Sequence, residues 1–192
     1  MSSYCTAARG HDIHGPYHDT EYGFPLASDD ALFERLVLEI NQAGLSWLTI
    51  LRKRDAFRAA YDGFSVDRVA EYGDAERARL MGDAGIVRNR LKVNAAIENA
   101  RRIRALRESH GSFDAWLRAH LQDEDGAVRD RDSWRRLFKR TFVFTGGEIV
   151  NEFLVSTGYL PGAHAADCPA YAKVIAAAPA WSFLSEARRR RA

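Results

Sequence analysis

Cysteine is scarce in this 192-residue chain, and the chain has neither a long apolar run nor a low-complexity segment. A count of two cysteines excludes the disulfide-rich scaffolds of small secreted proteins and indicates a reducing, cytoplasmic setting. No stretch approaches the roughly 20 apolar residues that cross a bilayer, and the first residues lack the charged-then-apolar pattern of a signal peptide. The sequence therefore predicts no membrane partner.

The composition is that of an ordinary globular protein. Apolar residues make up 46% and charged residues 28% of the chain, which is enough for one sizeable core and too little for two domains. Helical periodicity dominates, and residues 142–144 are the one segment that suggests a strand. We predict a single all-α domain over residues 1–185, followed by a basic tail over residues 186–192, and we expect a monomer.

Serine, aspartate and glycine residues mark where the helices should begin and end. Ser28 precedes two acidic residues and an apolar stripe, which is typical of a capped helix N-terminus. A long helix is predicted from about Asn89 to His110, ended by Gly111. Other helix starts are predicted at Ser46, Ser65, Asp74, Ser112, Ser133, Gly147 and Pro169.

The helix that follows Ser28 carries a carboxylate in an unusual place. Leu32, Leu36 and Ile40 belong to its apolar stripe, and Glu39 lies on the same side of the helix. A buried charge is costly unless something pairs with it. Glu39 is therefore either a functional carboxylate or a core glutamate that is paired with an arginine or a backbone amide.

Each of the two cysteines has a histidine partner nearby in the sequence. Cys5 precedes His18, and His164 lies four residues before Cys168, a separation that one helical turn or tight loop closes. A Cys₂His₂ set is a closed tetrahedral site for zinc, and a site made of these four residues would join the two ends of the chain. Two buried thiols or one long-range disulfide are the alternatives. Other histidines equally available to Cys5 are His11 and His14.

Positive charge is gathered in three runs although the net charge is only +2. One run lies within residues 75–109, where a helix, a glycine-bearing turn and a second helix follow one another. Gly85 permits a left-handed backbone or a close approach, and Arg88, Arg90 and Lys92 would accompany outward amides of the second helix. A helix-hairpin-helix that holds DNA by its phosphates has this pattern, whereas the alternative is an ordinary helical corner with solvated arginines. The other two basic runs are residues 135–140 and 188–191.

Three longer motifs stand out: YHDTEYGFP at residues 17–25, LEINQAGLSW at residues 38–47, and AGIVRNRLK at residues 84–92. Together they resemble bacterial 3-methyladenine DNA glycosylase I, and the resemblance extends from Cys5 to Cys168. It implies an all-α fold of the helix-hairpin-helix glycosylase superfamily. It also implies an enzyme that flips an alkylated purine out of double-stranded DNA, hydrolyses its glycosidic bond and leaves an abasic site.

The resemblance implies a role for each motif residue. Glu39 would be the catalytic residue, which receives hydrogen bonds from the base and favours its positive charge. The base-binding residues would be Tyr17, Tyr22, Trp47 and Gln42. The DNA-binding residues would be Gly44, Leu45, Gly85, Val87, Arg88, Arg90 and Lys92. Leu45 would act as a wedge in the duplex, unless it belongs to the core. A structural zinc ion would be held by Cys5, His18, His164 and Cys168.

Several positions depart from the family pattern. The residues concerned are Ala7 and Tyr22 in place of tryptophans, His14 and Asn151 in place of tyrosines, Glu148 in place of threonine, and Val155 in place of glutamine. Fewer aromatic rings and one more carboxylate would alter the selectivity among alkylated bases. The alternatives are therefore a divergent module that binds damaged DNA with little turnover, or a glycosylase for another modified base.

Overall fold

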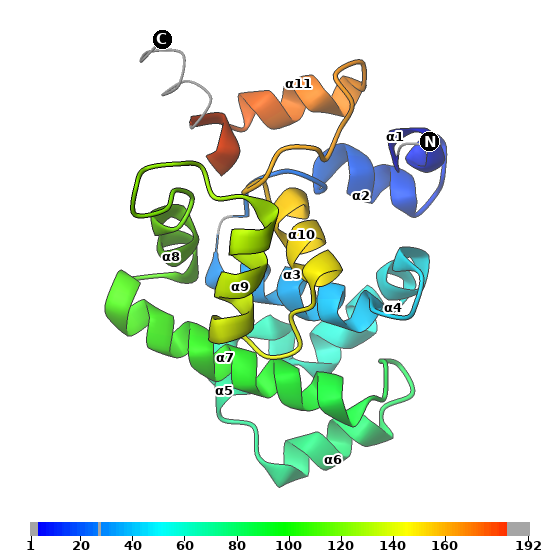
Figure 1. The fold of residues 1–192 in the computed structure, drawn as a ribbon. Helices are drawn as coiled ribbons and strands as arrows, with labels where there is room; N and C mark the ends of the chain where they lie inside the picture. The colour runs from blue at the N-terminus through cyan, green and yellow to red at the C-terminus, as the bar shows by residue number, and fades with distance from the viewer. Residues whose placement is uncertain (1–3, 27, 184–192) are drawn as a thin grey trace.

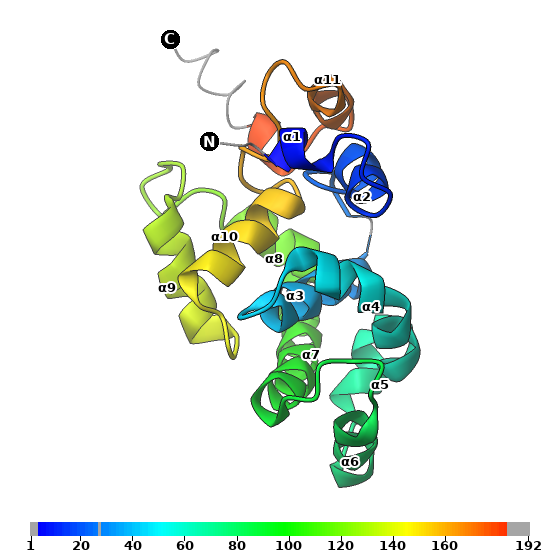
Figure 2. The same cartoon turned by 90° about the vertical axis from the view of Figure 1, so that its right-hand side faces the viewer.

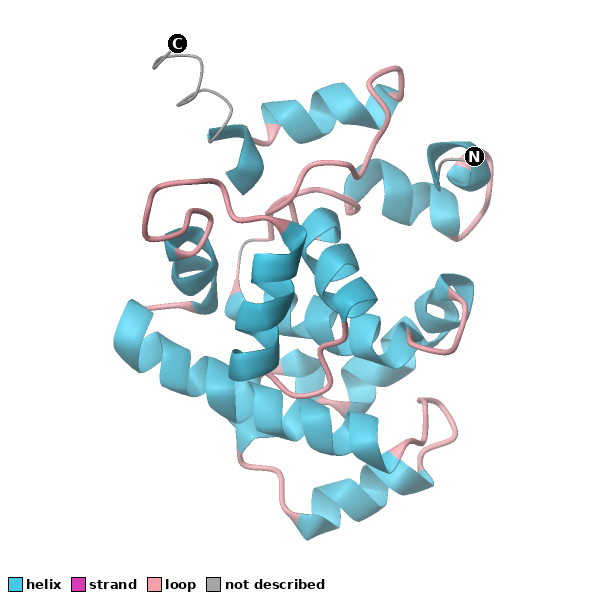
Figure 3. Cartoon of the chain, viewed as in Figure 1, coloured by secondary structure: helices cyan, strands magenta, loops and turns pink. Residues whose placement is uncertain are grey.

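The computed structural model describes residues 4–26 and 28–183 and consists of helices joined by loops (Figures 1 and 3). In chain order the helices are α1 (Tyr4–Ala8), α2 (His14–Thr20), α3 (Asp29–Gln42), α4 (Trp47–Ala60), the 3₁₀ turn η1 (Asp62–Phe64), α5 (Val66–Ala70), α6 (Asp74–Gly82), α7 (Arg90–His110), α8 (Phe113–Ala119), α9 (Arg131–Thr141), α10 (Gly147–Ser156) and α11 (Pro169–Ala176). The described residues form no strand, only an isolated bridge between Gln122 and Val128. The predicted all-α class is confirmed for this part of the chain.

Helix α3 lies at the centre of the fold, where it contacts α4, α7, α8 and α10 (Figures 1 and 2). Nine of its 14 residues are buried, which is more than one apolar stripe supplies, so the helix is enclosed on nearly all sides. Three of the buried residues are polar or charged, namely Arg35, Glu39 and Asn41. The central helix of the core therefore also carries buried polar and charged side chains.

Most of the predicted helix starts are confirmed by side-chain caps. Four serine hydroxyls accept a hydrogen bond from the backbone N–H three residues later: those of Ser28, Ser46, Ser65 and Ser112. Asn89 caps α7, and Gly111 ends it with φ = 83°. The predicted cap at Ser133 is wrong, because Asp130 accepts from the Ser133 N–H at 2.7 Å and α9 already begins at Arg131.

The suggested strand at residues 142–144 is also wrong. Phe142 ends α9 and packs into the core, with its ring centroid 5.3 Å from that of Phe113. The Asn99 side chain takes the place of a partner strand: it accepts from the Val143 N–H at 2.7 Å and donates to the Val143 carbonyl at 3.0 Å. Phe144 then adopts a left-handed backbone with φ = 61°, which interrupts the extended segment.

The N-terminal helices lie near the last long helix of the described chain, since α1 packs on α2 and α2 contacts α11 (Figures 1 and 2). Neither α1 nor α2 was predicted. The Gly15-Pro16 pair inside α2 is typical of a turn, but proline is tolerated in the first turn of a helix. Within the described residues, no helix combines the length and hydropathy needed to cross a bilayer. The predicted basic tail, residues 186–192, lies outside the described residues.

Candidate active site

A cavity of about 240 Å³ lies among α2, α3, α4 and α10. Seven side chains line it: Tyr4, Tyr17, Tyr22, Glu39, Gln42, Trp47 and Glu152. The predicted catalytic residue and all four predicted base-binding residues are therefore in one cavity. The cavity is concave and largely aromatic with a few polar groups, as small-ligand sites commonly are.

Glu39 is buried in the wall of this cavity, with 4% of its surface exposed. The Ser156 hydroxyl donates to Glu39 Oε1 at 3.4 Å, and no ion pair to Glu39 occurs in the described part of the chain. The nearby Arg35 instead contacts Glu21 at 3.5 Å and donates to the Tyr17 hydroxyl at 2.8 Å. Burial raises the pKa of Glu39 from 4.5 to about 8, although the charge of Arg35 opposes this. The alternative of a core glutamate held in an ion pair with an arginine is therefore not what the structure shows.

The aromatic walls of the cavity come from α2 and α4. The ring centroids of Tyr17 and Trp47 are 5.3 Å apart and the rings are tilted by 57°. Tyr17 is buried, and the guanidinium of Arg35 lies 4.9 Å from its ring centroid. Trp47 Nε1 is buried without a hydrogen-bond partner among the described residues. Since an unpaired buried donor is costly, this indole N–H is available to an acceptor on a bound molecule.

Sequence analysis missed two residues of the cavity, Tyr4 and Glu152. Tyr4 directly precedes a predicted zinc ligand, and its hydroxyl lies 2.9 Å from His14 Nδ1. Its ring is 5.1 Å from the ring of Tyr22. Ala7, where the family pattern has a tryptophan, is exposed and does not line the cavity. The aromatic wall on this side therefore comes from the other end of α1, for which the sequence offers no periodic signal.

The four predicted metal ligands converge beside the cavity. Their ligand atoms all lie within 4.8 Å of one another, in the set Cys5, His18, His164 and Cys168. Both cysteines are free rather than joined in a disulfide. His164 Nδ1 is 3.1 Å from His18 Nε2, 3.7 Å from Cys168 Sγ and 3.8 Å from Cys5 Sγ. Tetrahedral zinc, with bonds of about 2.0–2.3 Å, separates its ligand atoms by about 3.3–3.8 Å, so the spacing fits this ion.

The outer nitrogen atoms of the two histidines are also held in place. His18 Nδ1 lies 2.7 Å from Asp19 Oδ1, and His164 Nε2 lies 2.7 Å from the carbonyl oxygen of Tyr22. Such partners orient metal-binding imidazoles. The remaining histidine candidates are not part of this set, because His11 accepts hydrogen bonds from backbone N–H groups and His14 contacts Tyr4. Since Tyr22 also lines the cavity, the ligand set and the cavity share one wall.

The turn between α3 and α4 projects from the rim of the cavity. Gly44 adopts φ = 82°, a left-handed conformation that suits glycine. Leu45 is 41% exposed, which excludes the alternative that it is a core residue. Gln42 lines the cavity and its side-chain amide donates to the Leu45 carbonyl at 3.4 Å. The large apolar side chain of Leu45 is therefore exposed next to the cavity that Glu39 lines.

The loop between α6 and α7 differs in part from the prediction. The φ angle of Gly85 is not in the left-handed region, so glycine is needed only for close approach: an added Cβ would lie 3.0 Å from Ala56 Cβ. Lys53, which was not predicted, donates to the carbonyls of Ala84 and Gly85 at 3.1 and 3.0 Å. Two predicted cations are exposed, Arg88 and Arg90, whereas Val87 packs partly against the core.

Lys92 requires a correction, because its ammonium group is buried. It donates to the Asn41 carbonyl at 2.9 Å and to the Ala43 carbonyl at 2.6 Å, and burial lowers its pKa. It therefore fixes the end of α3 and is not available to a phosphate. Two amides at the start of α7 are not free either, since the Asn89 side chain accepts from the N–H groups of Leu91 and Lys92.

Side chains on one face of α7 hold two loops in place. Lys92 fixes the loop that leads to Leu45, and Asn99, two turns later, fixes Val143 in the loop between α9 and α10. Arg102, about one turn after Asn99, donates to the Thr141 carbonyl at 2.8 Å. The exposed Leu45 and the α9–α10 loop are therefore positioned by the same helix.

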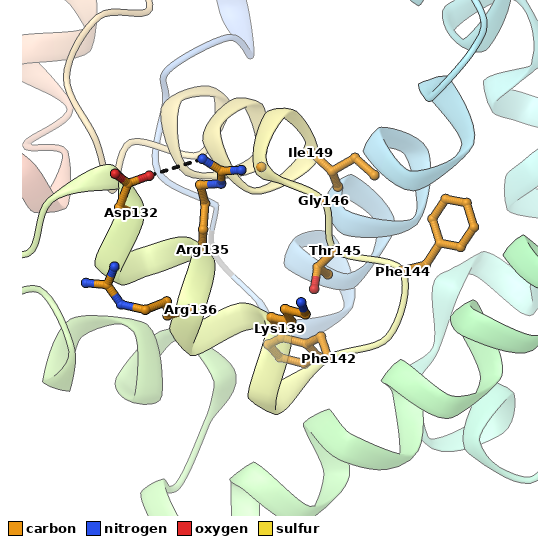
Figure 4. Close-up of a pocket in the computed structure, with 10 residues that line it drawn as sticks. Asp132, Arg135, Arg136, Lys139, Phe142, Phe144, Thr145, Gly146 and Ile149 are labelled. Atoms are coloured by element: carbon orange, nitrogen blue, oxygen red, sulfur yellow. Dashed lines mark hydrogen bonds and ion pairs between the residues drawn. The ribbon is translucent and has the colours of Figure 1, made fainter.

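The α9–α10 loop borders a basic depression of about 660 Å³. Figure 4 shows Arg135 extending from α9 toward the first turn of α10, with Lys139 and Phe144 at other edges. No side chain caps the N-terminus of α10, which begins at Gly147, and a Cβ added at Gly147 would clash with the Arg135 guanidinium. Uncapped helix amides beside guanidinium and ammonium groups suit an anion.

Comparison with known proteins agrees with this geometry. The sequence profile of the methyladenine glycosylase family matches residues 7–171. This chain belongs to the methyladenine glycosylase family. The matched segment contains the whole cavity except Tyr4, and three of the four clustered metal-ligand candidates.

Two curated relatives and one solved structure illustrate the similarity. The DNA-3-methyladenine glycosylase of Haemophilus influenzae is 31% identical over an alignment of 183 residues, and the alignment covers 88% of this chain and 98% of the relative. DNA-3-methyladenine glycosylase 1 of Escherichia coli is 33% identical over an alignment of 169 residues, and the alignment covers 81% of this chain and 89% of the relative. The crystal structure of a tyrosine-to-phenylalanine variant of 3-methyladenine DNA glycosylase I in complex with 3-methyladenine matches with a TM-score of 0.77 and 30% identity, covering 87% of this chain and 96% of the other.

Proposed function

We propose that this methyladenine glycosylase excises alkylated purines, above all 3-methyladenine, from double-stranded DNA in base-excision repair. The observation that carries the proposal is Glu39, a buried carboxylate without a basic partner among the described residues, in an aromatic cavity large enough for a single base. A base of this class carries a positive charge in DNA. The cationic base would therefore supply the counter-ion that Glu39 lacks.

The chemistry follows from the charge on the base. The N-glycosidic bond of a cationic purine breaks with its electron pair moving to the base, which leaves as a neutral molecule while water adds to the sugar carbon. Strong acid catalysis is therefore unnecessary, and the protein has to extrude, hold and select the base. An ionised Glu39 stabilises the cation electrostatically in a site that excludes water, while Tyr17 and Trp47 offer ring faces that attract it.

Binding of the cation also changes the protonation of Glu39. With its pKa raised to about 8 by burial, Glu39 holds a proton in the empty cavity at neutral pH. A cation within a few ångströms favours the ionised form and lowers this pKa. The cavity therefore avoids an isolated buried charge until a base of the right charge enters.

We infer that Leu45 fills the gap left by the extruded nucleotide. It is exposed on a turn that Lys92 fixes from behind and that ends beside the cavity. Apolar side chains that separate base steps are a common device of proteins that distort DNA.

The phosphates would be held at two places. Exposed Arg88 and Arg90 supply charge beside α7. Lys139 supplies charge beside the uncapped start of α10, together with Arg135, which also pairs with Asp132 at 3.1 Å. Lys139→Ala should weaken binding to any duplex and reduce the slope of log K against log salt by about 1. Arg118→Ala is the matched control, because Arg118 already pairs with Asp114; an equal reduction in both variants would contradict this assignment.

We also infer one structural zinc ion per chain, held by Cys5, His18, His164 and Cys168. Support comes from the spacing of these ligand atoms and from the partners of the two imidazoles. The ion would supply a cross-link between α2 and the segment before α11, next to the cavity wall. Elemental analysis of freshly purified protein should find one zinc per chain, and finding no metal would refute this inference.

The decisive experiment measures free bases by chromatography after incubation of the protein with methylated DNA. We expect 3-methyladenine to be released and abasic sites to remain. Tight DNA binding without release of any base would instead favour a damage-binding module. Release of a different base would identify a glycosylase for another lesion.

A further inference from the structure

Two of the seven side chains that line the cavity are carboxylates from different helices. α3 supplies Glu39 and α10 supplies Glu152, one turn before Ser156. Residues four apart share one face of a helix, and the Ser156 hydroxyl donates to Glu39. α10 therefore directs Glu152 and Ser156 to the cavity that contains Glu39.

Glu152 keeps capacity to accept hydrogen bonds. In the described residues it accepts from the Tyr22 hydroxyl at 3.3 Å and from the Asn151 side-chain amide at 3.4 Å, and both distances are long. An ionised carboxylate offers about four acceptor positions. Since Glu152 is only half-buried and lines the cavity, the remaining positions are accessible to a molecule inside it.

No ion pair to either cavity glutamate occurs within residues 4–26 and 28–183. This is unlike the rest of α3, where Glu34 pairs with Arg54 and Arg58. Two acids in one partly dry cavity repel each other when both are ionised, and each is costly to desolvate. Burial raises the pKa of Glu152 as it does that of Glu39, and the repulsion between them raises that of Glu39 further. A positively charged occupant removes both penalties, whereas a neutral one removes neither.

We propose that Glu152 is a second base-recognition residue, which accepts a hydrogen bond from the extruded base and, with Glu39, makes the cavity prefer cationic alkylated purines to neutral ones. This inference rests on the proposed function, because it concerns the same cavity. It adds a specificity determinant on α10, the helix in which this chain departs most from the family pattern.

The test compares two glutamates of α10. Glu152→Gln keeps the shape of the side chain and removes its charge. Glu148→Gln is the matched control, because Glu148 is exposed, lies one turn earlier and does not line the cavity. Binding of two free bases, the permanently cationic 3,9-dimethyladenine and neutral 3-methyladenine, is followed by tryptophan fluorescence or calorimetry. We expect Glu152→Gln to reduce the preference for the cation by about tenfold and Glu148→Gln to change it far less, because Glu148 acts on the cavity only through its repulsion of Glu152.

Three outcomes would overturn the inference: no change in Glu152→Gln, an equal loss of affinity for both bases, or an equal change of preference in both variants. The first would remove Glu152 from recognition, the second would make it a packing residue, and the third would reduce it to a distant charge. Base release from methylated DNA is measured on the same proteins. If the wild-type protein releases no base while the cation preference depends on Glu152, the proposed function fails and the role of Glu152 stands.

Discussion

The carboxylates of the ion-pair network beside α4 have basic partners, whereas those of the neighbouring cavity have none among the described residues, although α3 contributes to both regions. In the network, Arg54 donates to Glu21 at 2.6 and 2.7 Å and to Glu34 at 2.8 Å. In the cavity, Glu39 and Glu152 have no such partner among the described residues. One region satisfies its charges within the chain, and the other leaves them for a ligand.

The carboxyl groups of the two regions also differ in pKa. Burial raises the pKa of Glu21, but hydrogen bonds and attraction from Arg54 outweigh burial and hold it below 4.5. Burial dominates at Glu39, where the pKa is about 8. Paired carboxylates stabilise a fold, whereas an unpaired buried carboxylate costs stability and persists where function needs it. The comparison therefore assigns a structural role to the first region and a recognition role to the second.

The largest expected effect is the loss of base release in Glu39→Gln. Removing a charge that stabilises the developing transition state commonly costs about 100-fold in rate, while an uncharged amide in the same place should not lower the melting temperature. Single-turnover release of base from methylated DNA, with thermal unfolding of the same protein, measures both.

Trp47→Ala should also slow release without unfolding the protein. Equal activity of wild type and both variants would contradict the recognition role assigned to the cavity.

Arg54→Ala should lower stability and leave base release largely intact, which is the reverse of the effect expected for Glu39→Gln. It leaves the partly buried Glu21 without its main partner and Glu34 with Arg58 alone, so we expect the free energy of unfolding to fall by about 2 kcal/mol. Base release at a temperature well below the midpoint should remain within a few-fold of wild type, because Arg54 does not line the cavity. Urea denaturation and the release assay test the two statements separately. A loss of release as severe as that of Glu39→Gln would show that the network belongs to the site.

The pH dependence of stability should have opposite signs in the two regions. Glu39, which is influenced by Arg35 and Glu152, has a folded-state pKa above its unfolded value of 4.5, so the folded state binds the proton more tightly. Its contribution therefore lowers stability as pH rises from about 4.5 to about 8 and is constant above that. Glu21 has a lowered pKa, and the stability it contributes above pH 4.5 is lost as pH falls through its folded-state pKa.

Denaturation curves between pH 4 and 9 measure these contributions. Relative to Glu39→Gln, wild type should become progressively less stable from pH 5 to pH 8, and the two curves should then run parallel. Parallel curves over the whole range would mean that Glu39 is not a buried acid with a raised pKa.

The smallest expected effect distinguishes two cations at the start of α7. Arg88 is exposed and has no partner among the described residues, so Arg88→Ala should reduce the salt dependence of DNA binding by about one unit of slope. Lys92→Met should instead lower the unfolding midpoint, because it removes hydrogen bonds to the Asn41 and Ala43 carbonyls. Salt titrations and thermal unfolding of both variants separate these effects. Identical behaviour of the two would contradict the distinction between paired and unpaired cations.

Local signals predicted most of the helices because caps act over three or four residues. Ser28, Ser46, Ser65 and Ser112 carry that signal and were correct. Ser133 failed because Asp130, three residues earlier, is an equally good cap and is the one used. The segment 142–144 failed because its partner is the side chain of Asn99, more than 40 residues away, rather than another strand.

The candidate site was predictable where the motif residues carry the chemistry themselves. Glu39 was found as a carboxylate on an apolar stripe, whereas Tyr17 and Trp47 were assigned by the family resemblance of their motifs; all three line the cavity. Tyr4 and Glu152 were not found, because each reaches the cavity only through the packing of α1 and α10. Lys92 was misplaced because a long cationic side chain looks the same in a sequence whether it extends to solvent or turns inward to two carbonyls.

The sequence by itself determined the all-α class, most of the helix starts and a set of candidate residues for a base or a metal ion, because propensity, capping and residue chemistry act locally. Only the tertiary structure decided which of the charged residues have partners, because pairing depends on side chains that lie far apart in the chain. The two carboxylates in one cavity, and the choice between a solvent-facing and a buried lysine, follow from how α3, α7 and α10 pack.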